Sequence, residues 1–576
     1  MRWLSRPRAP LFVIALALAL ALPSFAIGFF SDDYALISYL EQRAPHSPPW
    51  WDLYRFTPGT DLGVERAIAA GQMPWWTTPA LRLHFVRPLP SALLALDLAL
   101  FGRHPLPWHV HSLLWYAALL FVVNAFFRRL LPAPTATLAL LLFALSDATV
   151  FPFAWPSARY GLPAALCAAA GIAAHVRHRR DGWRAGRWLA PSMLTVGLLS
   201  GESALGGFAF AVAYDLVGPG AAPALRDRLR RAAPLTALVL AYLLVYALVG
   251  GGARASTGYV SPLSDPGPFL AAALTRLPTM LGDAIMGVPS EAAAIGLGRV
   301  LAWVGAVATL LFVGFWRACA GQIPESERGD LGWLTLGGCV ALLAGVGGFP
   351  GARELLVPNL GFAPVLATLL VHAFERGRFV IVRRIGGTIL AVVHLLLLPI
   401  NQVGNERSMA AMARGTEVAA RVADASAPRI FLVAGSDPMV SMYVPALLQS
   451  ESARMGCWAW LSGARAAVTL TRTGPAAFAL EAASPGFLHG AFETLYRAPS
   501  HPMRTGEEVT VCRARVRAAS VDDGRPARIE VESDVALDDA STSWLVWNDG
   551  KLERVSFPAI GASTTFAWTP GPSRVF

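Results

Sequence analysis

A series of long apolar runs constrains this chain more than any other feature of its sequence. The first run, Leu11–Phe30, has about the 20 residues that a helix needs to cross a bilayer. Ten more segments follow: Val110–Phe127, Thr135–Phe151, Gly161–Val176, Trp188–Ser200, Ala204–Val217, Ala233–Gly250, Val300–Trp316, Leu331–Gly348, Leu355–Phe374 and Ile385–Ile400. Only 15% of the residues are charged, against about 25% in soluble proteins. We therefore predict a mainly α-helical, polytopic membrane protein with about 11 transmembrane helices.

The arginines between these runs predict the orientation of the helices. Arginine-rich loops recur at every second connection, at residues 128–129, 177–187, 226–231, 317–328 and 376–384. Because such loops stay in the cytoplasm, they place the N-terminus there, together with Arg2, Arg6 and Arg8. These topology signals account for the net charge of +10, so we expect no nucleic-acid partner. The expected location is a bacterial inner membrane, with membrane lipids as partners.

Two parts of this pattern have a second interpretation. The stretch Leu22–Ala26 could be a signal-peptide cleavage site, but the run around it is longer than a usual signal sequence, so a retained helix is favoured. The segments Trp188–Ser200 and Ala204–Val217 are short for a full crossing. They form either two tilted helices or one re-entrant hairpin.

The first run ends directly before two adjacent carboxylates, Asp32 and Asp33, on the side opposite the cytoplasm. Ionised carboxylates are costly in hydrocarbon, so they lie just outside it or in a polar cavity. The simplest interpretation is a charged pair that marks the membrane boundary. Other unusual polar residues also fall at helix ends on this side: Arg87, His109, His111, Arg159, Glu202, Arg353 and Glu354.

The chemistry of these groups favours a lipid-linked phosphate as the substrate. Arginine binds phosphate through paired, charge-assisted hydrogen bonds, and carboxylates activate hydroxyl groups or hold a divalent metal. Each residue also has a structural alternative. Arg159 and Arg353 could neutralise Glu202 and Glu354 or anchor helix ends. His109 could form a hydrogen bond at its helix end, since no second ligand stands at metal spacing.

Two long loops are expected on the extracytoplasmic side. The loop 31–109 carries Pro48-Pro49-Trp50-Trp51 and Pro74-Trp75-Trp76, and we expect these tryptophans at the level of the lipid headgroups. Within it, Asp61–Ala70 could form a short helix. The loop Gly251–Glu291 begins with many Gly, Pro and Ser residues, which predicts irregular structure.

The composition changes after residue 400, and residues 401–576 contain no further spanning run. Ile430–Ala434 is typical of a buried strand; a Gly-Ser-Asp-Pro turn and a helix to Leu448 follow it. Strand-like runs recur around Val468, Val511, Ile529, Trp544 and Phe566. We therefore predict two domains, a membrane domain at 1–400 and a soluble, strand-rich α/β domain at 401–576 in the periplasm. The turn lacks the pattern of a nucleophile elbow, which favours an ordinary strand-to-helix connection.

The five cysteines show no metal-ligand spacing. Cys457 and Cys512 fall in the predicted periplasmic domain, where disulfides form. The sequence leaves open whether they are bonded or are two free buried thiols.

Five short elements follow one another along the membrane part of the chain. They are Ser31–Ile37, then Val86-Arg87-Pro88-Leu89 with Leu100-Phe101-Gly102 and Trp108-His109, then Ala154–Arg159, then Ser200-Gly201-Glu202, and finally Arg353–Gly361. In this order they resemble elements of the GT-C superfamily of integral-membrane glycosyltransferases. The similarity is greatest to the bacterial branch related to protein O-mannosyltransferases and TMTC-type proteins. Gly201 and Ser146-Asp147 depart from the family, which usually has a lysine and a His-Pro at these places. The resemblance covers roughly Leu11–Ile400.

This resemblance implies a fold, a reaction and a set of site residues. It implies inverting transfer of a sugar from a polyprenyl phosphate to an acceptor hydroxyl at the periplasmic face. Asp32 would take the proton from the acceptor, and Asp33 and Glu202 would orient the acceptor or bind a divalent cation. Arg159 and Arg353 would stabilise the leaving phosphate. The residues implied to contact the substrates are Arg87, His109, Arg159, Glu202 and Arg353.

Two other classes of function remain open from the residues alone. One is a lipid or glycan transporter, which would need polar groups through the middle of the membrane. The other is a catalytically inactive envelope scaffold whose C-terminal domain binds a partner.

Overall fold

The computed structural model describes residues 3–423, 427–451 and 455–573, and Arg2 of the topology argument lies outside them. The chain divides into two compact units. Unit 1 comprises Met1–Gly28, Phe85–Val249 and Pro266–Arg407, and unit 2 comprises Phe29–His84, Gly250–Asp265 and Ser408–Phe576. Two segments that the sequence assigns to the membrane domain therefore belong to the same compact unit as the C-terminal strands. That residues 401–576 form a separate domain stays a prediction.

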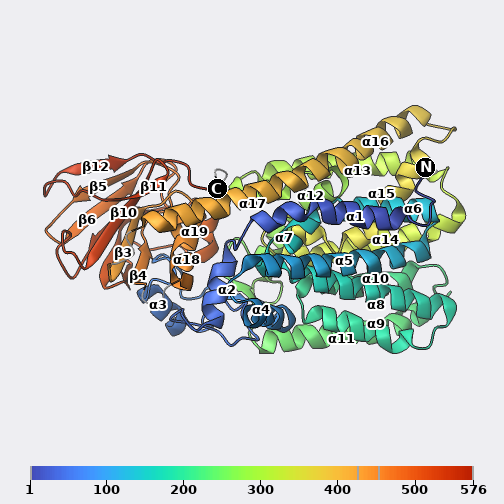
Figure 1. Cartoon of the computed structure of the whole chain (residues 1–576), viewed down its shortest axis with the longest axis horizontal. Helices are drawn as coiled ribbons and strands as arrows, with labels where there is room; N and C mark the ends of the chain where they lie inside the picture. The colour runs from blue at the N-terminus through green and yellow to red at the C-terminus, as the bar shows by residue number, and fades with distance from the viewer. Residues whose placement is uncertain (1–2, 424–426, 452–454, 574–576) are drawn as a thin grey trace. The chain divides into compact units, whose positions relative to one another are not determined.

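Unit 1 is helical, and seven helices of the described residues are long and apolar enough to cross a membrane. They are α1 (Ala9–Leu20) with η1 (Leu22–Ala26), α5 (Pro105–Leu130), α11 (Leu225–Leu248), α12 (Pro266–Met286), α13 (Gly298–Ala320), α14 (Glu325–Val346) and the continuous run from α16 (Val380–Val392) through η7 (Val393–Leu397) to α17 (Leu398–Val422). The broken pair α6 (Ala133–Ala144) and η2–α7 (Asp147–Ala154) would make an eighth. The unit also contains α8 (Gly161–Asp181) and the shorter helices α4 (Pro88–Phe101), α9 (Gly186–Leu198), α10 (Leu205–Val217) and α15 (Asn359–Ala373). Helices α5, α8, α10 and α14 lie side by side (Figure 1).

The predicted fold class, a mainly helical membrane protein with a strand-rich C-terminal part, is confirmed; the number of crossings stays a prediction. The predicted loop 251–291 is wrong from residue 266 on, because α12 is a helix of 21 residues. The Gly-, Pro- and Ser-rich start is irregular at residues 255–265, after the short strand Gly252–Arg254. The prolines Pro266 and Pro268 of α12 stand in its first turn, where the missing N–H is tolerated. The last predicted segment also ends too early, since the helix continues from Ile400 to Val422.

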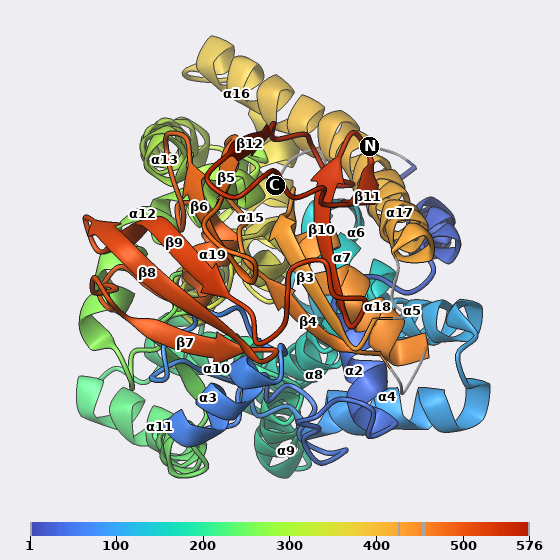
Figure 2. The same cartoon turned by 90° about the vertical axis from the view of Figure 1, so that its left-hand side faces the viewer.

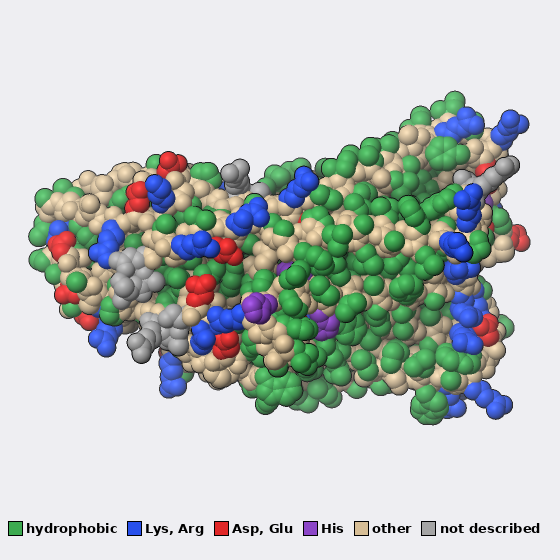
Figure 3. Space-filling model, viewed as in Figure 1, with side chains coloured by type: hydrophobic (Ala, Val, Ile, Leu, Met, Phe, Trp, Pro, Cys, Tyr) green, Lys and Arg blue, Asp and Glu red, His purple; other side chains and the backbone are tan. Residues whose placement is uncertain are grey.

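Ion pairs join the helix ends that the arginine pattern places in the cytoplasm. The links run from α5 to α8, from α8 to α10 and from α8 to α14: Arg129 with Asp181 at 2.6 Å, Arg179 with Asp215 at 2.8 Å, and Arg180 with Asp330. These ends therefore share one face of unit 1. Basic side chains gather at this end of the helices, and hydrophobic side chains cover the helices beyond it (Figure 3).

Unit 2 contains a four-stranded and a six-stranded sheet. The first has the order β11 (Lys551–Arg554), β10 (Thr542–Asn548), β3 (Arg429–Ala434) and β4 (Cys457–Trp460), with β3 parallel to both neighbours. The second is antiparallel, in the order β12 (Ser563–Phe566), β5 (Val468–Arg472), β6 (Ala477–Ala482), β9 (Arg525–Glu532), β8 (Ala514–Asp522) and β7 (Glu508–Val511). Figure 2 shows β7, β8 and β9 side by side. The strands predicted in this region are all present. Apart from Arg429, strand β3 is apolar, because both of its faces are buried.

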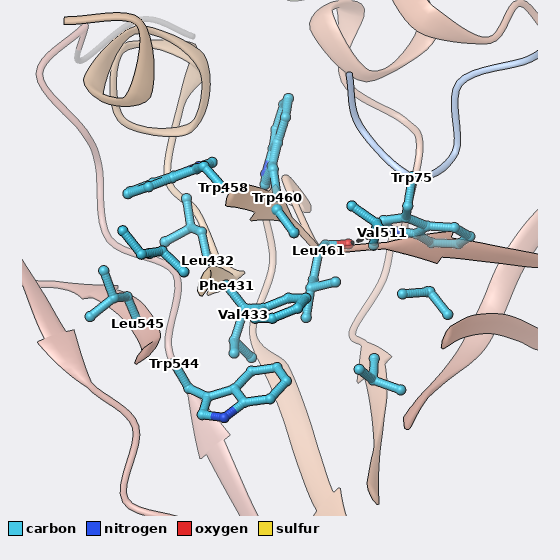
Figure 4. Packing of buried hydrophobic residues seen from close by; sticks show 14 of the residues in the cluster. Trp75, Phe431, Leu432, Val433, Trp458, Trp460, Leu461, Val511, Trp544 and Leu545 are labelled. Carbon is cyan, nitrogen blue, oxygen red and sulfur yellow. Dashed lines mark hydrogen bonds between the residues drawn. The ribbon is translucent and has the colours of Figure 1, made fainter. Parts of the chain in front are cut away.

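The loop after the first helix supplies part of the core of unit 2. Trp75 and Trp76 are each only 1% exposed. Trp75 lies beside Leu461 in the cluster shown in Figure 4, and its indole N–H donates to the Leu461 carbonyl at 3.0 Å. Trp76 donates to the carbonyl of Glu493 at 3.0 Å. The predicted headgroup position is therefore wrong for this pair, because a hydrophobic core with carbonyl acceptors satisfies both the ring and the N–H.

Other parts of the loop 31–109 and of the C-terminal region are also ordered. Helix α3 (Asp61–Ala69) forms as predicted, and β1 (Arg82–His84) pairs with β2 (Gly252–Arg254). Cys457 and Cys512, whose pairing the sequence leaves open, form a disulfide between β4 and the β7–β8 turn. This bond closes a loop with a sequence separation of 55 residues.

Candidate functional site

The two adjacent carboxylates open helix α2 (Asp32–Leu40) in unit 2, but their surroundings differ. Asp33 is 2% exposed, and its Oδ2 accepts the backbone N–H of Phe30 at 2.9 Å. It therefore ties the chain back at the helix N-terminus, where a negative charge is also favourable. Asp32 is only partly buried, and its Oδ1 accepts the phenolic O–H of Tyr443 at 3.0 Å. Asp33 therefore binds the backbone at the start of the helix, whereas Asp32 is bound by the side chain of Tyr443.

In unit 1, the structure brings Arg87 and Glu202 together. Arg87 Nε and Nη2 both donate to Glu202 Oε2, at 3.1 and 2.9 Å. The guanidinium also lies 3.7 Å from the ring centre of Tyr160, a cation–π contact. The other oxygen of Glu202 accepts the O–H of Tyr246 at 2.7 Å. The partner of Glu202 is thus Arg87 and not, as one alternative had it, Arg159.

Gly201, which stands where the family usually has a lysine, lies close to Arg87 and Tyr160. A Cβ at this residue would lie 3.3 Å from Tyr160 Cδ2 and 3.6 Å from Arg87 Nε. A lysine here would therefore start beside the guanidinium of Arg87 and bring a second cation to it. In this chain, Arg87 supplies the positive charge at that place.

Arg353 and Glu354 lie in the turn η6 (Ala352–Leu355) of unit 1. Arg353 Nε donates to Glu354 Oε1 at 3.3 Å, and the two side chains are 15% and 14% exposed. Burial raises the pKa of Glu354, while the charges of Arg353 and Arg87 act in the opposite direction. Arg87 and Glu202 are within electrostatic reach of Glu354. We call Arg87, Glu202, Tyr246, Arg353 and Glu354 the acid–arginine cluster.

A small pocket adjoins this cluster at Glu354. Its polar lining includes Thr275, Arg276 and Thr279 of α12, together with Ser290 and Glu354. Arg276 Nη1 donates to the carbonyls of Val346 and Gly348, both at 2.7 Å, and thereby anchors α12 to the end of α14. Arg276 was not among the predicted site residues, because residues 251–291 were expected to form a loop.

Arg159 lies in a different place, in a buried network inside unit 1. It is 2% exposed and pairs with Asp97, which is fully buried on α4. Its Nε donates to Ser112 Oγ and its Nη2 to the Trp108 carbonyl, both at 2.8 Å. His111 Nδ1 lies 2.6 Å from Asp97 Oδ1. This arrangement fixes the ends of α4 and α5 to the turn before α8.

His109, the neighbour of this network, also has a structural partner. Its Nε2 lies 2.8 Å from the carbonyl oxygen of Gly28, and the residue is fully buried. The hydrogen-bonding alternative for His109 therefore describes its contact in the structure. The bond ties α5 to the end of the first membrane segment.

Sequence reasoning missed several buried acids of unit 1. Asp97 is a lone carboxylate in an apolar helix, and that isolation is a signal that could have found it. Asp147 and Asp283 are 4% and 2% exposed and lie within electrostatic reach of each other and of Glu291. Ser290 Oγ donates to Asp283 Oδ2 at 2.6 Å. No sequence signal connects these acids, because they lie far apart along the chain.

The resemblance also implies a possible divalent cation, which would need acidic or histidine side chains grouped around it. Among residues 3–423, 427–451 and 455–573, no group of three or more His, Cys, Asp or Glu residues is arranged to hold a metal ion. Asp33, one of the two expected ligands, uses an oxygen on the Phe30 N–H. We therefore derive no step through a cation.

Comparisons with known proteins found similar solved structures but no matching sequence family. No protein-family model and no curated protein sequence matches the chain. The chain is similar to the Archaeoglobus fulgidus oligosaccharyltransferase tethered with an acceptor peptide (12% identity, TM-score 0.41, 80% of this chain and 65% of that one). It is also similar to ArnT from Cupriavidus metallidurans bound to undecaprenyl phosphate (14% identity, TM-score 0.36, 75% of this chain and 84% of that one).

The chain spans about 65% of the length of the oligosaccharyltransferase that it matches.

Proposed function

We propose that this chain is an inverting GT-C glycosyltransferase that moves a sugar from a polyprenyl-phosphate donor to an acceptor hydroxyl at the periplasmic face of a bacterial inner membrane. The observation that carries the proposal is the division of roles between Asp32 and Asp33. Asp33 is buried against the Phe30 N–H, whereas Asp32 is partly exposed and oriented by Tyr443. A pair that only marked a membrane boundary would need neither arrangement.

In this reaction Asp32 acts as the general base. It accepts the proton of the acceptor hydroxyl while the hydroxyl oxygen attacks the anomeric carbon of the sugar. The bond from that carbon to the phosphate oxygen breaks, and the polyprenyl phosphate leaves with the bonding electron pair. A single displacement of this kind inverts the anomeric centre. Asp33 supports the reaction by fixing the start of α2.

The leaving phosphate gains negative charge, and donors aimed at developing charge contribute most to catalysis. Arg353 and Arg87 of the acid–arginine cluster are partly exposed and are the residues we propose for this role. Glu202 holds Arg87 in place through its two hydrogen bonds. Arg159 takes a different role from the one that the resemblance implies. Because it is buried against Asp97, we propose that it positions α4 and α5 and does not contact the phosphate.

The proposal can be tested with the full-length protein in lipid nanodiscs. A panel of undecaprenyl-phosphate hexoses and pentoses is offered with envelope lipids and proteins from a deletion strain as acceptors, and release of undecaprenyl phosphate is measured. Wild type should release it from at least one donor, and Asp32→Asn should release it at least about a hundredfold more slowly. Movement of an intact glycolipid across a vesicle membrane, without release of undecaprenyl phosphate, would instead support the alternative that the protein is a lipid or glycan transporter.

The orientation in the membrane needs its own test. The shared arginine face motivates a cytoplasmic N-terminus and a periplasmic C-terminus. Reporter fusions within residues 177–187 and after residue 576 should report opposite sides of the membrane. The same side for both fusions would contradict the predicted topology.

A further inference from the structure

Tyr443 connects the C-terminal part of the chain to the carboxylate of Asp32. Its phenolic O–H donates to Asp32 Oδ1 at 3.0 Å, and both residues belong to unit 2. Tyr443 is the last residue of the π-helix η8 (Met439–Tyr443) and is 8% exposed. Its ring is therefore enclosed by protein, and the hydroxyl is presented from a fixed position.

The turn before η8 is built to hold that position. Asp437 Oδ1 accepts the N–H of Val440 at 3.2 Å, and its Oδ2 accepts the N–H of Ser573 at 2.8 Å. Gly435–Pro438 is an ordinary strand-to-helix turn, as the sequence suggests, but it also sets where Tyr443 lies. The turn therefore has a structural role, and no catalytic nucleophile has to be assigned to it.

Helix α18 (Val444–Glu451), which continues η8, packs on α2. Just beyond the end of α2, Arg43 Nη1 donates to the Ser450 carbonyl at 2.5 Å, and Gln449 Nε2 donates to the Arg43 carbonyl at 3.3 Å. The two elements are therefore linked at one end through Tyr443 and Asp32 and at the other end through Arg43. This double attachment restricts movement of Asp32 relative to Tyr443.

The backbone before Asp32 is also constrained. Ser31 has a φ of 53°, a conformation that residues other than glycine rarely adopt. Such conformations persist only where the surrounding structure enforces them, and they are enriched at functional sites.

Three tyrosines are in electrostatic reach of Asp32. Tyr39 comes from its own helix, Tyr443 from η8 and Tyr496 from α19 (Ala491–Tyr496). Asp33 is the adjacent ionisable group on α2. The hydroxyl of Tyr496 points to Met442 Sδ, at 3.7 Å. Tyr496 is therefore a tyrosine of the same neighbourhood with a different hydrogen-bond partner.

We propose that Tyr443 is a positioning residue for the reaction: it holds one carboxylate oxygen of Asp32 and thereby fixes the orientation of the base and favours its ionised form. The inference rests on the proposed role of Asp32 as the base. A hydrogen bond donated to a carboxylate stabilises the charged form, so removing it should make Asp32 easier to protonate. The C-terminal part of the chain then contributes to catalysis through its hold on Asp32.

The first arm of the test needs no substrate. The acid titration of the Asp32 carboxyl is followed by infrared difference spectroscopy, with Asp32→Asn subtracted, in wild type, Tyr443→Phe and Tyr496→Phe. Tyr443→Phe keeps the ring and removes only the hydroxyl. We expect it to raise the titration midpoint by about one pH unit, the size of a charge-assisted hydrogen bond. Tyr496→Phe should leave the midpoint unchanged, and an unchanged midpoint in Tyr443→Phe would overturn the inference.

The second arm measures kcat/KM against pH with undecaprenyl-phosphate mannose or another donor that the panel identifies. Tyr443→Phe should move the acid limb of the profile to a pH about one unit higher. At pH values below that limb, its kcat/KM should be about tenfold lower than that of wild type. A loss of activity at all pH values with an unmoved acid limb would indicate a merely structural tyrosine and would also overturn the inference. If wild type uses no donor, the proposed function fails, while the infrared arm still decides whether Tyr443 controls Asp32.

Discussion

The strongest prediction separates the two carboxylates at the start of α2 by single substitutions. Asp32→Asn keeps the shape of the side chain and an oxygen for the Tyr443 O–H, but it removes the basic carboxylate. A general base contributes about a hundred- to ten-thousand-fold in rate, so turnover should fall at least about a hundredfold. That factor corresponds to about 2.7 kcal/mol of transition-state stabilisation. Thermal stability should remain near that of wild type.

Asp33 should show the opposite balance. Asp33→Asn still offers an oxygen to the Phe30 N–H at 2.9 Å and loses only the charge at the helix N-terminus, worth about 0.3–1 kcal/mol. Asp33→Ala also removes the acceptor from a buried N–H, which costs about 1–3 kcal/mol of stability. Turnover by Asp33→Asn should stay within about tenfold of wild type, because its effect is on the fold.

The assay combines two measurements on the same nanodisc samples, release of undecaprenyl phosphate and thermal unfolding. Turnover that survives in Asp32→Asn but disappears in Asp33→Asn, at equal stability, would reverse the assignment. If both variants turn over normally, the pair only marks the membrane boundary.

Three further predictions concern stability. Asp97→Asn should destabilise the protein by about 3–5 kcal/mol, because it leaves the charge of Arg159 buried without its partner; Asp97→Leu combined with Arg159→Met should melt higher than Asp97→Asn. Cys457→Ser should cost about 4 kcal/mol, from a closed loop with a separation of 55 residues, and reducing agent should lower the melting temperature of wild type but not of this variant. Burial raises the pKa of Glu493 from 4.5 to about 7, so the folded state binds more protons than the unfolded state between these values. Stability should therefore fall as pH rises from 4.5 to 7 in wild type, and Glu493→Gln should flatten this dependence.

The features of the fold that follow a local pattern could be predicted from the sequence. Arginines at alternate connections predicted a shared face, and the ion pair of Arg129 with Asp181 lies on it. Apolar β-branched runs predicted strands such as β3 and β5, since buried strands have a recognisable composition. Helix α12 was missed because its prolines and glycine outweighed the apolar residues that follow them.

The partners of the site residues could not be predicted, because long-range contacts leave no local signal. Nothing near Glu202 in the sequence indicates that Arg87 is its partner across 115 positions. The roles of Asp32 and Asp33 look alike in the sequence and separate only through a backbone N–H and a distant tyrosine. The sequence suggests a position among the lipid headgroups for Trp75, and only the structure shows that its indole N–H donates to the Leu461 carbonyl.

The composition of unit 2 changes how an inactive scaffold should be distinguished from an enzyme. Removing everything after residue 400 is the obvious test of whether the membrane part suffices for transfer. That truncation would also remove Leu461, which accepts the indole N–H of Trp75, and Tyr443, which holds Asp32. Loss of activity would then follow from an exposed core and a released carboxylate, whichever hypothesis is true. Point variants such as Asp32→Asn and Tyr443→Phe leave that core intact, so they separate chemistry from scaffolding where truncation does not.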